Sequence, residues 1–167
     1  VFEELVGAKF DLCHAHATPS STRRTLERMR DEARERLVGT TIPRVLYHAD
    51  LRSKHVQVHP DGSLVALLDW GSSEASDLPY ADLISLIVYE RQHRFGVHGG
   101  DAWRQLMERR GLTDAEERAL ASCAKGLELP EEYCRAVEAI FPVLVGGMAE
   151  KNWDYSRPRW LQRLYGL

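Results

Sequence analysis

The chain has 167 residues, a length that suits one domain with a buried core. Hydrophobic residues make up 44% of it and charged residues 28%, a balance typical of an ordered, soluble domain. The net charge of −3 disfavours a nucleic-acid partner, because broad nucleic-acid-binding surfaces are basic. No apolar run approaches the roughly 20 residues needed to cross a bilayer, so we also predict no membrane association.

The three cysteines, Cys13, Cys123 and Cys134, are widely spaced and form no CxxC pair. This pattern disfavours a structural zinc site and favours reduced thiols, so we predict a cytoplasmic location. No signal peptide is visible. The chain begins at Val1 inside what reads as a folded segment, and we therefore expect a fragment of a longer protein.

Two helices are predicted at the start of the chain. Residues 2–16 mix apolar and polar positions at a helical period, and Thr18–Ser21 reads as a loop that caps a second helix. The second helix carries one apolar stripe, formed by Leu26, Met29, Ala33 and Leu37. Its acidic and basic residues alternate, which indicates a solvated face rather than a nucleic-acid surface.

A β-hairpin is predicted next, after Gly39 and Pro43 end the helix. Val56–His59 alternates in the manner of a strand, residues 60–62 supply a tight turn, and Leu64–Leu68 is a continuous apolar strand. A polar loop therefore lies at each outer end of the hairpin.

The remainder is predicted to be helical. We expect helices over Leu78–Arg94 and Asp101–Arg110, a third that opens with a capping box at Thr113, and a core helix over Pro130–Glu150. The tail Trp153–Leu167 is expected to pack on the surface. The predicted fold class is α+β, mainly helical, with one small embedded hairpin.

Two carboxylates, Asp50 and Asp69, lie in the loops at the two outer ends of the hairpin. Because a hairpin brings its outer ends together, we expect these side chains to face each other across a narrow gap. Two such carboxylates repel unless a proton or a cation lies between them, and Mg²⁺ prefers oxygen ligands. Arg52 and Lys54, in the first loop, are placed to meet phosphate charge.

The motifs resemble those of the aminoglycoside phosphotransferases and choline kinases, which have a protein-kinase-like fold. Residues 48–55 read H-A-D-L-x-x-x-H, where the family carries H-G-D-L-x-x-x-N. Residues 68–71 read L-D-W-G, and the run from Asp77 to Leu83 is similar to the family segment D-P-x-x-D-L. The resemblance implies that His48 is a structural residue beneath the motif and that the second aspartate of the last segment, Asp82, anchors a helix.

The resemblance implies that residues 1–167 form one catalytic domain, the C-terminal lobe of an ATP-dependent phosphotransferase. Such an enzyme transfers the γ-phosphoryl group of ATP to a hydroxyl of a small polar metabolite, with Mg²⁺ as cofactor. The 47 residues before His48 contain neither a glycine-rich loop nor a V-A-I-K-like strand. We therefore expect the N-terminal nucleotide lobe to be absent from this chain and to be its partner in the complete enzyme.

The predicted catalytic and binding roles fall on five residues, of which Asp50, Asp69 and His55 match positions of the family motifs. Asp50 is predicted to be the catalytic base, assisted by Arg52, and Asp69 the metal ligand. Lys54 and His55 are predicted to bind the nucleotide, with His55 as a second metal ligand. His55 stands where the family has asparagine, and imidazole is a poorer ligand for Mg²⁺ than an amide oxygen. Two alternatives therefore stay open: a degenerate, pseudokinase-like module that binds a ligand or partner, and a purely structural helical domain.

Overall fold

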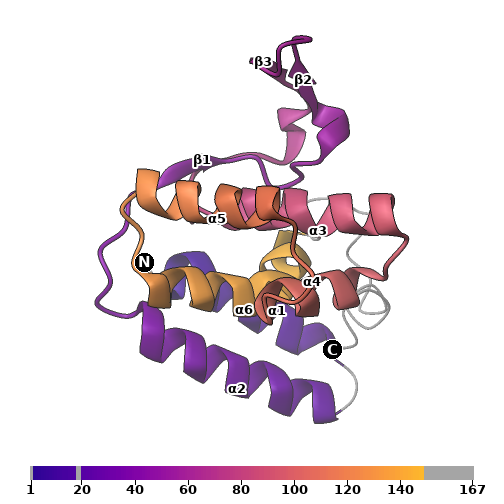
Figure 1. The fold of residues 1–167 in the computed structure, drawn as a ribbon. Coiled ribbons are helices and arrows are strands. Elements are labelled where there is room, and N and C mark those ends of the chain that lie inside the picture. The colour runs from indigo at the N-terminus through magenta and orange to yellow at the C-terminus, as the bar shows by residue number, and fades with distance from the viewer. Residues whose placement is uncertain (1, 18–19, 149–167) are drawn as a thin grey trace.

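A computed structural model describes residues 2–17 and 20–148 of the chain (Figure 1). Within these ranges the helices are α1 (Ala8–His16, preceded by a π-helical turn at Glu3–Gly7), α2 (Ser20–Leu37), α3 (Ala81–Phe95), α4 (Gly99–Met107), α5 (Asp114–Gly126) and α6 (Glu131–Met148). The strands are β1 (Val45–Tyr47), β2 (Val56–Val58), β3 (Leu64–Leu67) and β4 (Glu74–Asp77). The predicted surface tail at Trp153–Leu167 lies outside the described residues.

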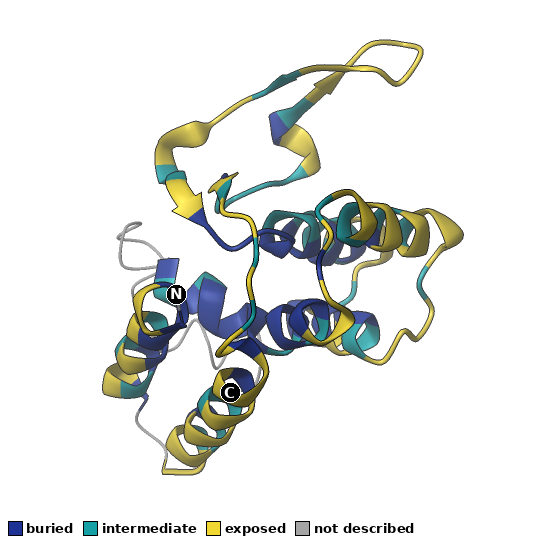
Figure 2. Ribbon diagram, turned by 90° about the vertical axis from the view of Figure 1, so that its left-hand side faces the viewer, coloured by how far each residue is buried: buried dark blue, intermediate teal, exposed yellow. Residues whose placement is uncertain are grey.

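The predicted hairpin is confirmed. Strands β2 and β3 pair antiparallel, with Val56 opposite Leu67 and Gln57 opposite Ala66. The turn between them uses Gly62 at a φ of +86°, a conformation that glycine adopts without steric cost. The hairpin projects from the helical body in Figure 1 and is largely exposed in Figure 2.

A second antiparallel pair, β1 with β4, lies at the base of the hairpin. The sequence analysis did not predict β4, because Glu74–Asp77 is polar and short and gives no apolar alternation. The helical turn at Trp70–Ser72 returns the chain alongside β1, where β4 pairs with it. The pair joins the helical body to the loops at the outer ends of the hairpin.

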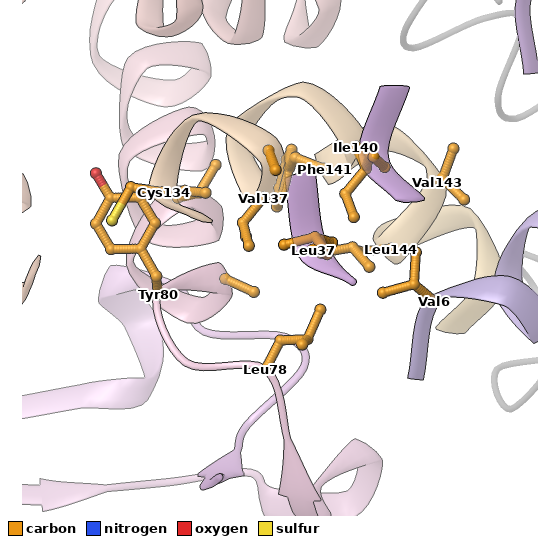
Figure 3. Packing of buried hydrophobic residues seen from close by; sticks show 14 of the residues in the cluster. Val6, Leu37, Leu78, Tyr80, Cys134, Val137, Ile140, Phe141, Val143 and Leu144 are labelled. Carbon is orange, nitrogen blue, oxygen red and sulfur yellow. The ribbon is translucent and has the colours of Figure 1, made fainter. Parts of the chain in front are cut away.

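Helix α6 is the centre of the core, as predicted. It packs against α1 and α2 on one side and against α3 and α4 on another. Figure 3 shows side chains of α6 meeting residues from the other elements. The labelled core residues are Val6, Leu37, Leu78, Tyr80, Cys134, Val137, Ile140, Phe141, Val143 and Leu144.

A proline within α6 is accommodated by a neighbouring tryptophan. Pro142 has no amide hydrogen, so it cannot donate to the carbonyl of Glu138 one turn earlier. The indole Nε1 of Trp103, on α4, donates to that carbonyl at 2.7 Å. The side chain of Glu138 is buried and accepts from the Tyr80 hydroxyl at 3.0 Å and from Arg109 at 2.6 Å.

The same helix fixes the start of α3. The hydroxyl of Tyr133 donates to the carbonyl of Pro79 at 3.0 Å, and Tyr80 is bound to Glu138. The helix was predicted to begin at Leu78, but α3 begins at Ala81. Residue 78 precedes a proline, which disfavours helical backbone, and Tyr80 has a φ of +78°. Helix α3 therefore starts at a position set by α6.

Other expectations are also confirmed. Helix α2 runs to Leu37, and α5 opens with a capping box in which Thr113 and Glu116 bond each other's backbone amides. The predicted Asp101–Arg110 helix begins two residues earlier and ends at Met107. Among the described residues, none of the helices has the length and apolar character required to span a membrane.

Candidate active site

The β1–β4 pair positions the loop that follows β1. Val45 lies opposite Asp77 and Tyr47 lies opposite Glu74. The Tyr47 side chain is buried, so the end of β1 is fixed in the core. The chain leaves the sheet at His48, the first residue of the predicted catalytic loop.

The carboxylate of Asp82, in the first turn of α3, holds the backbone of this loop. One oxygen accepts from the amide of His48 at 2.7 Å and the other from the amide of Ala49 at 3.0 Å. Burial raises the pKa of Asp82, and the two amide donors oppose that rise. Ala49 has a φ of +70°, which costs energy for a residue with a Cβ atom. The two hydrogen bonds hold the loop in this conformation.

The side chain of His48 joins the loop to the far end of the hairpin. It is buried, and its Nε2 donates to the carbonyl of Leu68 at 2.8 Å. Its ring centroid lies 4.7 Å from that of Trp70 and 5.6 Å from that of His55. Trp70 in turn donates to the carbonyl of Leu67 at 2.8 Å. His48 therefore packs beneath the motif and bonds the backbone, as the sequence indicated.

Asp50 and Arg52 form an ion pair within the loop. The guanidinium Nε and one terminal nitrogen of Arg52 both lie 2.7 Å from Oδ1 of Asp50. The guanidinium also lies over the ring of Tyr89, on α3, 4.3 Å from its centroid. Arg52 was expected to contact phosphate, whereas in the structure its guanidinium forms an ion pair with the carboxylate of Asp50. Two contacts therefore fix Arg52, and Arg52 in turn fixes one oxygen of Asp50.

His55 connects the two ends of the hairpin. Its Nδ1 lies 2.8 Å from the backbone carbonyl of Asp50, and its Nε2 lies 3.5 Å from Oδ2 of Asp69. The His55 side chain is 6% exposed, whereas the Asp69 side chain is 66% exposed. Asp69 has a left-handed backbone, with a φ of +64°. The structure thus places one imidazole in contact with both predicted catalytic loops, while Lys54 is exposed beside it.

A family model described as the phosphotransferase enzyme family matches residues 8–124. The chain belongs to the phosphotransferase enzyme family. The matched span contains both loops, the hairpin and α3, so the resemblance drawn from the motifs is confirmed. No curated protein and no solved structure matches the chain.

For a member of the phosphotransferase enzyme family, the ion to test against the site is Mg²⁺. Asp69 suits it, because its exposed carboxylate offers oxygen ligands at the end of the hairpin. His55 does not, because it offers a buried nitrogen. Within residues 2–17 and 20–148, no group of three or more His, Cys, Asp or Glu side chains is arranged to hold a metal ion.

Two contributions of α3 in this phosphotransferase-family chain were not predicted from the sequence. Asp82 was expected to anchor a helix, but not to bind the loop amides. No role was expected for Tyr89, which packs against Arg52. Tyr89 follows Asp82 by seven residues, or two helical turns, so the two project from one face of α3. That spacing was the available signal.

Proposed function

We propose that this chain is the catalytic lobe of an ATP-dependent phosphotransferase whose acceptor is a hydroxyl of a small polar metabolite. The family match supports phosphoryl transfer. The observation that carries the proposal is the junction at His55, which contacts the backbone of Asp50 and the carboxylate of Asp69. One ring thereby joins the proposed base to the proposed metal ligand.

In the proposed reaction, Asp50 orients the acceptor hydroxyl. The hydroxyl oxygen bonds the γ-phosphorus of ATP, the bond from that phosphorus to the bridging oxygen breaks, and ADP leaves. The hydroxyl proton passes to Asp50. Since Arg52 binds Oδ1, the other oxygen of Asp50 is the one that meets the hydroxyl. Catalysis of this kind depends mainly on positioning and on charge stabilisation.

Asp69 is proposed to hold the divalent ion, which the family resemblance predicts to be Mg²⁺. The bound ion would neutralise phosphate charge on ATP. Lys54 is exposed next to the junction, where its ammonium group would meet the same phosphates. ATP as co-substrate, together with the free thiols of the three cysteines, supports a cytoplasmic location.

The exposed apolar residues of the hairpin are evidence that a second lobe of the protein packs against it. Val58, Leu64 and Val65 are 56%, 60% and 49% exposed, and Leu68 is also exposed. Val58 and Leu64 are paired across the hairpin, and exposed apolar residues gathered on one short hairpin support a contact site. We propose that residues 1–167 form one domain and that a nucleotide-binding lobe of the same protein covers the hairpin, enclosing ATP between them.

The test is metal-dependent ATP turnover by the full-length protein over a panel of hydroxylated metabolites. Asp50→Asn and Asp69→Asn are compared with Asp31→Asn, a matched change at an exposed position on α2. Asparagine tolerates the left-handed backbone at residue 69, so the second variant is expected to fold. Turnover that both site variants abolish and the control retains is the expected result. Well-folded protein without turnover would refute the proposal and favour the pseudokinase-like binding module.

A further inference from the structure

We propose that the cation position beside Asp69 selects a divalent ion of the first transition row over Mg²⁺, with His55 as its nitrogen ligand. The inference deepens the proposed function and rests on it for the role of the ion in phosphoryl transfer. Its basis is the orientation of one buried ring.

The hydrogen bond at Nδ1 fixes the tautomer of His55. The partner of Nδ1 is the backbone carbonyl of Asp50, 2.8 Å away, and a carbonyl can only accept. Nδ1 therefore carries a hydrogen, and the neutral ring, the form that binds metal ions, has its lone pair on Nε2. In that form, Nε2 directs its lone pair toward the carboxylate of Asp69, 3.5 Å away.

This arrangement leaves two electron-pair donors facing each other. Nε2 of His55 is buried and has no hydrogen-bond partner among the described residues. Its 3.5 Å separation from Oδ2 of Asp69 is too long for a good hydrogen bond. Two ligand atoms that each lie about 2.1 Å from one ion are about 3.0–3.4 Å apart. The observed separation is therefore close to that of two ligands of a single cation.

The ring cannot easily turn away from this position. His55 is buried against His48, with nearly parallel rings at an interplanar angle of 19°. Its own backbone is held at both ends, since its amide donates to Arg52 and its carbonyl accepts from Leu68. The nitrogen ligand is thus preorganised, which is what a metal site requires of its first ligands.

The two ligand atoms, Nε2 of His55 and Oδ2 of Asp69, determine which ions the site favours. Mg²⁺ demands oxygen ligands, so the imidazole contributes little to its binding. First-row transition ions accept imidazole and carboxylate together, with affinity rising from Mn²⁺ toward Co²⁺ and beyond. Mn²⁺ is the weakest of these ions, so a preference for Mn²⁺ over Mg²⁺ is a stringent test.

The experiment uses Mn²⁺ alone with the full-length protein. Pulsed electron paramagnetic resonance detects coupling of bound Mn²⁺ to a ligand ¹⁴N nucleus, and displacement by Mg²⁺ gives the relative affinity. His55→Asn, which restores an amide, is compared with His59→Asn, the same change at an exposed position of the same hairpin. Thermal unfolding checks that both variants fold.

We expect nitrogen coupling in the wild type and in His59→Asn, and none in His55→Asn. We expect the ratio of Mn²⁺ to Mg²⁺ affinity to fall by at least about tenfold in His55→Asn, since even indirect metal partners change affinity by that much. Absence of Mn²⁺ binding, absence of nitrogen coupling, or an unchanged ratio would overturn the inference. Nitrogen coupling without ATP turnover would retain it and refute the proposed function. Turnover with Mg²⁺ but no nitrogen coupling would overturn the inference and retain the proposed function.

Discussion

Replacing Glu138 by leucine tests how far α6 stabilises the start of α3, the helix whose Asp82 binds the proposed catalytic loop. The buried carboxylate accepts from the Tyr80 hydroxyl at 3.0 Å, from Arg109 at 2.6 Å and from Arg135 at 3.1 Å. Tyr80 immediately precedes α3, whose Asp82 binds the loop amides. Loss of the carboxylate therefore removes one of the two hydrogen bonds by which α6 fixes the start of α3.

The expected loss of unfolding free energy is about 2–4 kcal/mol. The buried Tyr80 hydroxyl is left without its acceptor, which costs about 1–3 kcal/mol. Arg109 and Arg135 are more than a third exposed, so both turn to water and add only about 1 kcal/mol. Leucine has a volume similar to that of glutamate, so no large cavity opens.

Urea unfolding of four proteins measures this effect: the wild type, Glu138→Leu, Tyr80→Phe and the double variant. Tyr80→Phe removes the hydroxyl that Glu138→Leu leaves without an acceptor. The loss of unfolding free energy caused by Glu138→Leu is therefore expected to be about 1–2 kcal/mol smaller in the Tyr80→Phe background. Additive costs within about 0.5 kcal/mol would refute the reasoning, since they would show no coupling between these residues. A loss of unfolding free energy below about 0.5 kcal/mol in Glu138→Leu alone would also refute the reasoning.

Three further predictions concern single positions. Ala49→Gly should stabilise the fold by about 0.5–1 kcal/mol in urea unfolding, because glycine relieves the positive φ. Gly147→Ala should destabilise by about 1–3 kcal/mol, because its Cβ would lie 2.5 Å from Cβ of Lys9, whereas Gly126→Ala, with open space around it, should not. Burial raises the pKa of Cys13 from 9.0 to about 12. Its contribution to stability is therefore complete below pH 9 and lost as pH rises toward 12, and native protein should resist alkylation at Cys13 at pH 8.

Local signals made the hairpin and most helices predictable. The turn at residues 60–62 and the flanking alternation specify β2 and β3 within about a dozen residues of chain. The capping box at Thr113 likewise marks the start of α5 without reference to the rest of the fold. Each motif loop is a short continuous stretch of sequence, so Asp50 and Asp69 can be proposed as site residues from the sequence alone.

Contacts between distant segments could not be predicted. β4 depends on β1, about 30 residues away, and its own polar sequence carries no strand pattern. The bond from Trp103 to the carbonyl beneath Pro142 depends on how α4 crosses α6. The contact between the Arg52 guanidinium and the ring of Tyr89 depends on how α3 lies against the loop. Each of these is set by tertiary packing rather than by local propensity.

The Arg52 pair leads to a prediction that separates positioning from phosphate binding. Arg52→Lys keeps the positive charge but loses the planar group that contacts both Oδ1 of Asp50 and the Tyr89 ring. If Arg52 positions Asp50 as the proposed base, kcat should fall by about 10–100-fold, because small misplacements of catalytic groups cost that much, while KM for ATP changes little. Arg28→Lys, at an exposed position on α2, is the control. A raised KM for ATP with unchanged kcat would instead place Arg52 on the phosphates and show that its contact with Asp50 has no part in catalysis.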